Sequence, residues 1–244
     1  MSGEPSTPVS GLRSALGFLT VVGGADAPAP VAMRWFPVVG AAIGGVIGCT
    51  WWGAGELWPP VVAASIAVAA DAVLTGALHH DGLADAADGL LPHMDRDRRL
   101  AVMREPDVGA FGVVAVVAAM LLLTSGLTAL EPAPTLLAGL WCASRTTMAV
   151  VTRVVPYARS EGIASAFLGG SPVAVGLLGA GLATLLAVVA IDWQGAVAVA
   201  CTFAAGGSVV LLARSRIGGF TGDVLGAAGV VGQTTGVLVA AARW

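Results

Sequence analysis

Residues 36–53 read FPVVGAAIGGVIGCTWWG, an uncharged and mainly apolar stretch. A helix that crosses a bilayer needs roughly 20 apolar residues, because each residue advances it by about 1.5 Å. Within the stretch Gly40, Gly44 and Gly48 recur every four residues, and small residues at that spacing let a neighbouring helix approach closely. The stretch therefore predicts a membrane-spanning helix that packs tightly against another helix.

The rest of the chain contains six further apolar runs of similar length and a shorter run at residues 11–22. The six are residues 60–79, 109–130, 133–153, 172–191, 195–213 and 222–242. Together the runs predict an all-α, polytopic membrane helical bundle of about seven transmembrane helices, in a single integral membrane domain over residues 1–244. The shorter run predicts an interfacial or re-entrant helix.

The composition of the whole chain agrees with a membrane location. Hydrophobic residues make up 57% of its 244 residues and charged residues only 11%, whereas a soluble domain carries roughly 25% charged residues. The net charge of −3 supplies no basic field for a polyanion. These values exclude a soluble globule, a disordered segment and a nucleic-acid-binding module. They make the lipid bilayer the expected partner and leave a homo-oligomer open.

The arginines lie in alternate connections between the predicted spans, and cytoplasmic connections are the ones that carry a basic excess. One set of connections or span edges holds Arg13, Arg34, Arg96, Arg98, Arg99, Arg104, Arg153, Arg159, Arg214 and Arg216, and the other set holds Glu56, Glu131 and Asp192. Only Arg243, at the C-terminus, breaks the alternation. The pattern predicts a protein of the cytoplasmic membrane with its N-terminus inside and its C-terminus outside.

Three aspartates follow the second predicted span, in residues 79–89 (HHDGLADAADG). Asp81, Asp85 and Asp88 occupy positions i, i+4 and i+7, which lie within about 40° of one another on a helix. Like charges at that spacing destabilise a helix unless a cation compensates them. Carboxylate oxygens are hard ligands that suit Mg²⁺ or Mn²⁺, which bind through one or two carboxylates together with phosphate oxygens. The alternative is a solvated acidic turn at the end of a membrane span.

The stretch from about residue 80 to 108 continues with acids and arginines in alternation. Arg98 and Arg104 belong to an arginine-rich loop of the kind that the cytoplasmic face favours. Guanidinium groups also match phosphate geometry, so the same arginines can face the phosphates that a metal holds. The two interpretations are compatible and predict a cytoplasmic catalytic segment.

Two ionisable residues fall inside predicted spans, where charge is costly and is by default a functional candidate. Asp71 and Arg145 lie at similar depths, roughly 12–14 Å from the cytoplasmic ends of their helices at 1.5 Å per residue. The equal depth suggests that they pair with one another or that both line a polar cavity.

Two more polar clusters fall on the same predicted face. Residues 156–162 (PYARSEG) join the fourth and fifth spans, and residues 218–223 (GGFTGD) open the seventh. Glycine-rich backbone before a helix offers N–H groups to an anion, and Asp223 suits either the helix dipole or a metal. Three clusters that are far apart in sequence but lie on one membrane face predict an assembled site.

The motifs in order resemble the signature of the cobalamin synthase family, also called adenosylcobinamide-GDP ribazoletransferase or cobalamin-5′-phosphate synthase. The matching blocks are residues 79–89 (HxDGLADxxDG), Arg96-Asp97-Arg98, Met103-Arg104, Gly109, Ser144-Arg145, residues 157–162 (YARxEG) and residues 218–227 (GGxTGDxLGA). The similarity runs from about Phe18 to the C-terminus.

The resemblance implies an integral membrane, Mg²⁺-dependent phosphotransferase with its active site on the cytoplasmic face. Its donor is adenosylcobinamide-GDP, its acceptor is the 5′-hydroxyl of α-ribazole or of α-ribazole 5′-phosphate, and GMP leaves. The metal ligands implied are Asp81, Asp85 and Asp88. The residues implied to neutralise phosphate are Arg98, Arg104, Arg145 and Arg159, with Asp223 or His79 as base or further ligand.

The chain departs from the family pattern at two places. Residues 104–107 read REPD, where relatives often have Arg-Asp-Ser-Arg, and Val230 and Gln233 stand where relatives often carry acids. The roles that these positions have in relatives are therefore not assigned to the residues of this chain. Asp71 matches no family pattern, which favours a local or structural role.

Three other functional classes share some of these sequence features. A CDP-alcohol phosphotransferase also places aspartates at helical spacing, but its longer motif, with two acids well downstream of an Ala-Arg pair, is absent from the sequence. A transporter would use Asp71 and Arg145 as coupling charges, although the sequence contains no convincing internal repeat. A prenyltransferase with aspartate-rich motifs is a more distant alternative.

The predicted orientation can be tested by labelling single cysteines in sealed vesicles. Asp95→Cys should be protected from an impermeant thiol reagent applied outside, because its loop is predicted to be cytoplasmic, whereas Glu131→Cys should react. Labelling of position 95 from outside would contradict the orientation.

Overall fold

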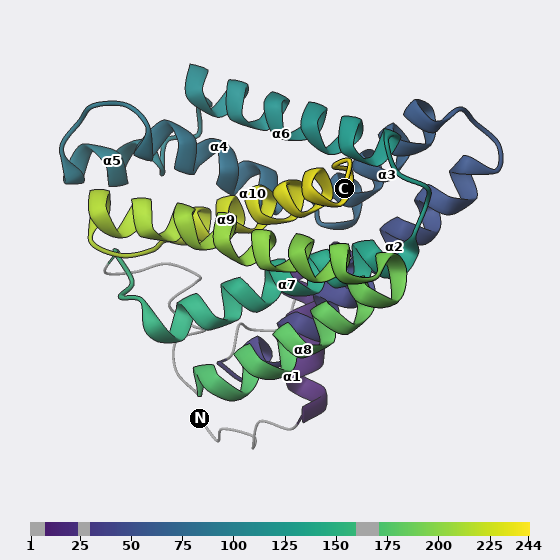
Figure 1. Ribbon diagram of the computed structural model, residues 1–244. Coiled ribbons are helices and arrows are strands. Elements are labelled where there is room, and N and C mark those ends of the chain that lie inside the picture. The colour runs from purple at the N-terminus through teal and green to yellow at the C-terminus, as the bar shows by residue number, and fades with distance from the viewer. Residues whose placement is uncertain (1–7, 24–29, 160–170) are drawn as a thin grey trace.

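The computed structural model describes residues 8–23, 30–159 and 171–244, and the regular structure in these ranges is helical (Figure 1). The helices are α1 (Pro8–Leu19), the 3-10 helix η1 (Pro30–Arg34), α2 (Phe36–Gly55), α3 (Pro60–Leu74), α4 (Leu78–Leu90), α5 (Arg96–Val102), α6 (Ala110–Thr128), α7 (Pro134–Val154), α8 (Pro172–Ile191), α9 (Trp193–Ile217) and α10 (Gly222–Ala240). The all-α helical bundle expected from the sequence is confirmed.

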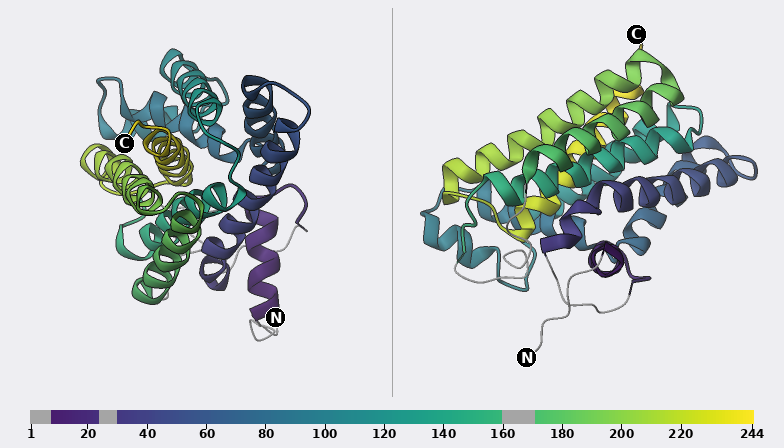
Figure 2. Two further views of the ribbon diagram at one scale, coloured as in Figure 1. Left: turned by 45° about the vertical axis from the view of Figure 1, so that its right-hand side comes forward. Right: turned by 90° about the horizontal axis from the view of Figure 1, so that it is seen from below.

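The bundle is arranged around α7 and α10. The helix α7 packs against α2, α8, α9 and α10, while α10 also contacts α4 and α6. Figure 2 shows α7, α8, α9 and α10 side by side along a common direction, with α1 seen end-on across them in the right-hand view. The short helix α1 therefore runs across the spans. The prediction that residues 11–22 form an interfacial or re-entrant helix in the bilayer stays a prediction.

Among the described residues, five helices are long and apolar enough to cross a membrane, namely α2, α6, α8, α9 and α10. The pair α3 and α4 makes a sixth if it is one broken span. The helix α7 has 21 residues but also carries Arg145, Arg153 and several hydroxyl side chains, and most of it is buried inside the bundle. The number of about seven transmembrane helices therefore stays a prediction, as does the orientation.

The predicted continuous helix over residues 60–79 is wrong. The helix α3 ends at Leu74 and the chain bends by 88° before α4. Gly76 and Ala77 have positive φ angles of 59° and 56°, which end a right-handed helix. The Ala77 N–H donates to the Ala72 carbonyl (2.7 Å) and the Gly76 N–H to the Val73 carbonyl (3.2 Å), which is the Schellman arrangement.

The chain after α1 provides a further partner at this bend. The Val21 N–H donates to the Leu74 carbonyl over 2.9 Å. Hydrocarbon offers no water to pair with a freed carbonyl, so an interrupted helix needs such internal partners. The N-terminal segment therefore helps to hold the position at which α3 gives way to α4.

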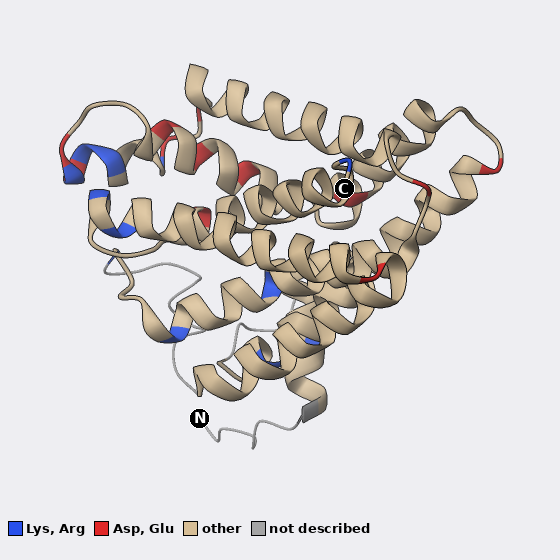
Figure 3. Cartoon of the chain, viewed as in Figure 1, with Lys and Arg blue, Asp and Glu red and all other residues tan. Residues whose placement is uncertain are grey.

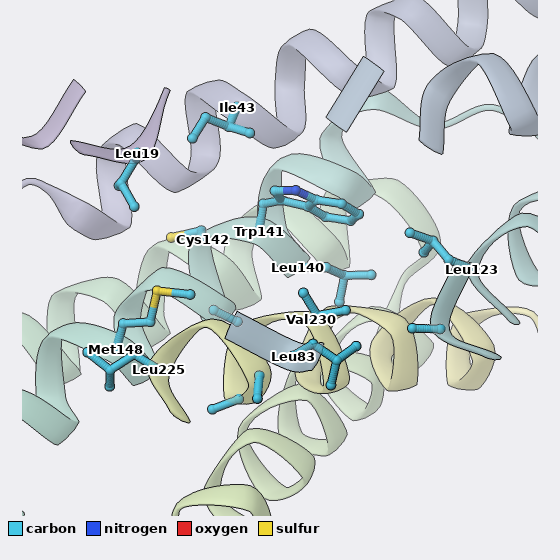
Figure 4. Close-up of a cluster of buried hydrophobic side chains, with 14 of the residues drawn as sticks. Leu19, Ile43, Leu83, Leu123, Leu140, Trp141, Cys142, Met148, Leu225 and Val230 are labelled. Atoms are coloured by element: carbon cyan, nitrogen blue, oxygen red, sulfur yellow. The ribbon is translucent and has the colours of Figure 1, made fainter. Parts of the chain in front are cut away.

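Close packing between α2 and α7 follows the glycine repeat. A Cβ atom added at Gly44 would overlap the Leu137 carbonyl, and one added at Gly40 would lie 2.7 Å from the Trp141 carbonyl oxygen. Figure 4 shows Trp141 at the centre of the buried apolar cluster that this approach encloses. The predicted role of the repeat in helix packing is confirmed.

The packing predicts different outcomes for neighbouring glycines. Gly44→Ala should lower the free energy of unfolding by about 1–3 kcal/mol, because the added methyl group forces α2 away from α7. Gly45→Ala is the matched control, since a Cβ there meets nothing within 4 Å. Thermal unfolding in detergent measures both variants, and equal stability of the two would contradict the prediction.

Candidate active site

The charged residues of the described chain gather at the end of the bundle that carries α5 (Figure 3). The acidic side chains of α4 and the arginines of α5 lie at this end, together with the C-terminal end of α9 and the start of α10. The opposite end shows mainly the isolated acids of the connecting loops. The expectation that the polar clusters share one end is confirmed, with Glu161 and Gly162 lying outside the described residues.

Two of these clusters are joined directly through their backbones. The Ala158 N–H donates to the Phe220 carbonyl (2.8 Å), and the Phe220 N–H donates to the Pro156 carbonyl (3.0 Å). The rings of Tyr157 and Phe220 meet edge to face with centroids 5.2 Å apart. This bridge fixes the loop after α7 against the loop that opens α10.

The bridge places Arg159 beside Asp223. An Arg159 guanidinium nitrogen, Nη2, lies 2.8 Å from Asp223 Oδ2, and both side chains are largely buried. The same nitrogen donates to the Met103 carbonyl at 3.3 Å, and the Thr221 hydroxyl donates to Asp223 Oδ2 at 3.1 Å. Thr221 also caps α10 by accepting from the Val224 N–H. Asp223 is therefore held in place at a helix N-terminus.

The aspartate helix α4 lies against α10 through two glycines. A Cβ added at Gly82 would be 3.3 Å from the Gly226 Cα, and one added at Gly226 would be 3.3 Å from the Gly82 Cα, so each position favours the smallest residue. This approach brings Asp85 into electrostatic contact with Asp223 and Arg159 as well as with the other aspartates of α4. The site thus collects several carboxylates around one guanidinium.

Asp88 differs from the other two aspartates of α4. It is buried, and its two carboxylate oxygens accept from the Gly109 N–H (2.7 Å) and the Gly112 N–H (2.9 Å) at the start of α6. A carboxylate at a helix N-terminus satisfies unpaired donors and the positive end of the helix dipole. Asp88 therefore joins α4 to α6, and its assignment as a metal ligand stays a prediction.

The arrangement of carboxylates fits a divalent cation that a substrate helps to bind. Within the described ranges, no three acidic, histidine or cysteine side chains converge closely enough to hold a metal on their own. Asp81, Asp85 and Asp223 nevertheless interact electrostatically with one another, and Arg159 is a single compensating charge. Mg²⁺ typically binds through one or two carboxylates plus substrate phosphates, so the donor set suits that ion.

A cavity of about 280 Å³ opens beside these groups. Its polar lining includes His79, Asp81, Arg159 and Asp223, and its apolar lining includes Phe18, Met33, Phe36, Leu78, Met148 and Leu225. Tyr157 also lines it, and burial raises the pKa of the Tyr157 phenol, which keeps the hydroxyl neutral near pH 7. The cavity brings polar residues from three separate motifs to one space.

Comparison with known proteins identifies the family of the chain. The family model described as cobalamin-5-phosphate synthase matches residues 11–241. The chain belongs to this family. Three relatives are named adenosylcobinamide-GDP ribazoletransferase: one from Chlorobaculum parvum is 39% identical over 90% of this chain and 90% of its own length. One from Chlorobaculum tepidum is 37% identical over 97% and 96%, and one from Azorhizobium caulinodans is 42% identical over 78% and 76%. No solved structure matches the chain.

The cobalamin-5-phosphate synthase motifs do not bring all the predicted arginines into the cavity. Arg159 lines it. Arg98 instead pairs with Glu105 at 2.7 Å on the exposed side of α5, and Arg104 is exposed but close enough to interact electrostatically with Tyr157. The phosphate-binding roles of Arg98 and Arg104 stay predictions, and Arg104 is the nearer of the two to the cavity.

Two arginines without an assigned role in the sequence analysis fix the position of α5. Arg96 donates through Nε to the Ile217 carbonyl and through Nη2 to the Ala158 carbonyl, each over 3.0 Å. Arg99 is buried, and its Nη1 donates to the last carbonyls of α4, those of Gly89 and Leu90, at 2.8 Å. The basic pattern of residues 96–104 signalled a cationic loop, but only the tertiary structure separates these anchors from the exposed arginines.

Arg145 lies in a buried polar network beneath the family motifs. Its Nη1 donates to Gln233 Oε1 (2.6 Å) and to the Ser144 hydroxyl (3.0 Å). Gln233 Nε2 donates to Asp71 Oδ2 (3.4 Å), and Trp141 Nε1 donates to Asp71 Oδ1 (2.9 Å). The interaction expected between Asp71 and Arg145 therefore runs through Gln233. A direct phosphate contact of Arg145 stays a prediction.

Gln233 was not assigned a role from the sequence, because it departs from the residue type that relatives often carry. Its amide can donate to a carboxylate and accept from a guanidinium at the same time, which a carboxylate at that position could not do. It thereby connects α3 to α7 across α10. The signal that could have found it was its polarity inside an otherwise apolar span.

The network predicts coupled effects on stability. Asp71→Asn and Arg145→Gln should each lower the free energy of unfolding, and their joint effect should differ from the sum by about 0.5 kcal/mol or more. Denaturant titrations in mixed micelles measure the cycle. As a control, Asp71→Asn combined with Ser208→Ala, an exposed change on α9, should be additive. Additivity of the Asp71 and Arg145 changes would contradict a shared network.

Proposed function

We propose that the protein transfers the adenosylcobinamide-phosphoryl group from adenosylcobinamide-GDP to α-ribazole or α-ribazole 5′-phosphate. GMP is released and adenosylcobalamin or its 5′-phosphate is formed, which is an assembly step of coenzyme B12. The name shared by the relatives supports this activity. The observation that carries the proposal is that Asp81, Arg159 and Asp223, from three family motifs, line one cavity.

The reaction exchanges a phosphoanhydride bond for a phosphoester bond. The 5′-oxygen of the acceptor forms a bond to the phosphorus that carries the cobinamide ester, and the bond from that phosphorus to the bridging oxygen breaks, so that this oxygen leaves with GMP. The acceptor hydroxyl loses its proton in the process. Transfer of this kind depends mainly on positioning and on neutralisation of charge.

Asp81 is the best-placed group to accept the proton. It lines the cavity and its side chain is exposed to it, whereas Asp223 is engaged by Arg159 and Thr221. A general base has to lie within hydrogen-bond reach of the hydroxyl that it deprotonates. His79, which also lines the cavity, is the alternative base or further ligand that the family resemblance implies.

Arg159 is the cation best placed to stabilise the transferring phosphoryl group. It lines the cavity, and its Nε is buried without a partner among the described residues, so the guanidinium retains donor capacity beyond Asp223 and Met103. A guanidinium presents its donors in a planar fork that matches phosphate oxygens. Charge that develops on those oxygens is stabilised most strongly by donors that are already oriented.

Mg²⁺ is the proposed cofactor. Asp81 and Asp85 are the residues proposed to hold it, with Asp88 as the third ligand that the motif predicts. The ion would neutralise the diphosphate of the donor, which Arg159 alone cannot do. We further propose that the protein lies in the cytoplasmic membrane with this site on the cytoplasmic face, which the distribution of arginines supports.

Asp81 can be tested against a matched aspartate on α5. Asp81→Asn should reduce the rate of GMP release by about 100-fold or more, because it removes a base and a metal ligand but preserves the shape of the side chain. Asp97→Asn is the control, since the Asp97 side chain is 92% exposed and does not line the cavity.

The assay uses purified protein in detergent with adenosylcobinamide-GDP, α-ribazole and Mg²⁺, and product GMP is quantified by chromatography. Chelation of the metal should stop the reaction, and added Mg²⁺ should restore it. Full activity of Asp81→Asn would falsify its proposed role, and saturable uptake without GMP release would favour a transporter.

A further inference from the structure

The cavity beside Asp81 has an apolar wall that the transfer reaction itself does not need. Phe18 and Phe36 stack with ring centroids 6.0 Å apart and an interplanar angle of 22°. Met33 lies between them in the chain, and Leu78, Met148 and Leu225 add further apolar surface from α4, α7 and α10. Residues from six helical elements therefore contribute apolar surface to a cavity that also has a small set of charged groups.

The size of the cavity limits what can occupy it. Ligand cavities for drug-sized molecules have volumes of about 300–1,000 Å³. At about 280 Å³, this one accepts a small aromatic group with part of a sugar, but not a corrin macrocycle. If the proposed function is correct, the cavity therefore holds either the acceptor nucleoside or the guanine end of the donor.

The polarity of the wall distinguishes these two occupants. Guanine carries donors and acceptors around its ring edge, and each one costs free energy when it is buried without a partner. Among the described residues that line the cavity, the groups that could pair with that edge are chiefly Asp81, Arg159 and Asp223, which the proposed function assigns to the transferring phosphoryl group and the proton. The base of α-ribazole is a dimethylbenzimidazole, whose edge is hydrocarbon apart from one free ring nitrogen.

The imidazole of His79 is one of the lining groups that can pair with that nitrogen. His79 is 4% exposed, and its Nδ1 is buried without a partner among the described residues. An imidazole can donate one hydrogen bond to a ring nitrogen in its neutral form. A wall with aromatic and aliphatic side chains and one imidazole suits an apolar heteroaromatic base.

We propose that this wall binds the benzimidazole base of the acceptor and that Phe18 and Leu78 determine acceptor specificity. The inference rests on the proposed function. A base bound at this wall directs the ribose 5′-hydroxyl toward Asp81 and the Arg159–Asp223 pair, and the donor stays outside the cavity except for its diphosphate. The acceptor is thus selected by the shape and apolarity of its base, and the donor by its phosphates.

The experiment measures the KM of each substrate separately. Phe18→Ala should raise the KM for α-ribazole about tenfold or more, because an aromatic contact surface is lost, with the KM for adenosylcobinamide-GDP and the kcat nearly unchanged. Leu78→Ala is a second wall variant on a different helix and should act in the same direction. Both side chains are partly exposed, so their truncation spares the buried core.

Phe111→Ala on α6 is the matched control, since Phe111 is 48% exposed and outside the cavity lining, and both of its KM values should equal those of the unmodified protein. Acceptors with a smaller or a more polar base should have a higher KM than α-ribazole in the unmodified protein, and this difference in KM should disappear in Phe18→Ala. A rise in the KM of the donor alone would assign the cavity to guanine and overturn the proposal. Unchanged KM values in both wall variants would also overturn it and would indicate a lipid-filled or structural cavity.

A separate measurement distinguishes failure of this inference from failure of the proposed function. If the unmodified protein releases no GMP, the proposed function fails. Saturation-transfer NMR with α-ribazole alone then tests the wall, with signals expected from the base protons that weaken in Phe18→Ala. Absence of transfer to the base in the unmodified protein would overturn the inference independently of turnover.

Discussion

The break between α3 and α4 is the constraint on which the site depends. A bilayer offers no water to backbone groups, so a helix that is interrupted inside the bundle has to satisfy its free carbonyls with protein. The left-handed pair Gly76 and Ala77 does this through its own backbone, and Val21 supplies one more donor. The resulting turn sets α4 against α10, where Asp81 and Asp85 interact electrostatically with Asp223.

Charged residues are scarce in this protein, and they serve two structural roles. Some charged groups hold helices together. Asp88 accepts hydrogen bonds from the start of α6, Arg99 donates hydrogen bonds to the end of α4, and Arg145 joins α7 to α10 through Gln233. Others are left facing the cavity, chiefly Asp81 and Arg159. Because the anchoring groups hold together the helices that carry the free ones, the free ones are held in place, which favours positioning of a substrate.

Much of this arrangement could be predicted from the sequence. Apolar runs gave most helices to within a few residues, the glycine repeat indicated the tight contact of α2 with α7, and the motifs around Asp81, Arg159 and Asp223 indicated one site. The break at Gly76 was missed because residues 60–79 are mainly apolar and a Schellman turn depends on local backbone geometry. Arg96 and Arg99 could not be separated from Arg98, since the three share type and neighbourhood and differ only in tertiary partners.

The N-terminal segment makes two structural contacts that cannot be altered independently. Phe18 belongs to the cavity wall, and three residues later Val21 pairs with the Leu74 carbonyl at the end of α3. Any sequence change that tilts α1 and reshapes the wall also shifts the Val21 N–H at the break between α3 and α4, and with it the start of α4. Changes that alter the cavity wall at Phe18 are therefore coupled through three residues of chain to the position of the α4 aspartates.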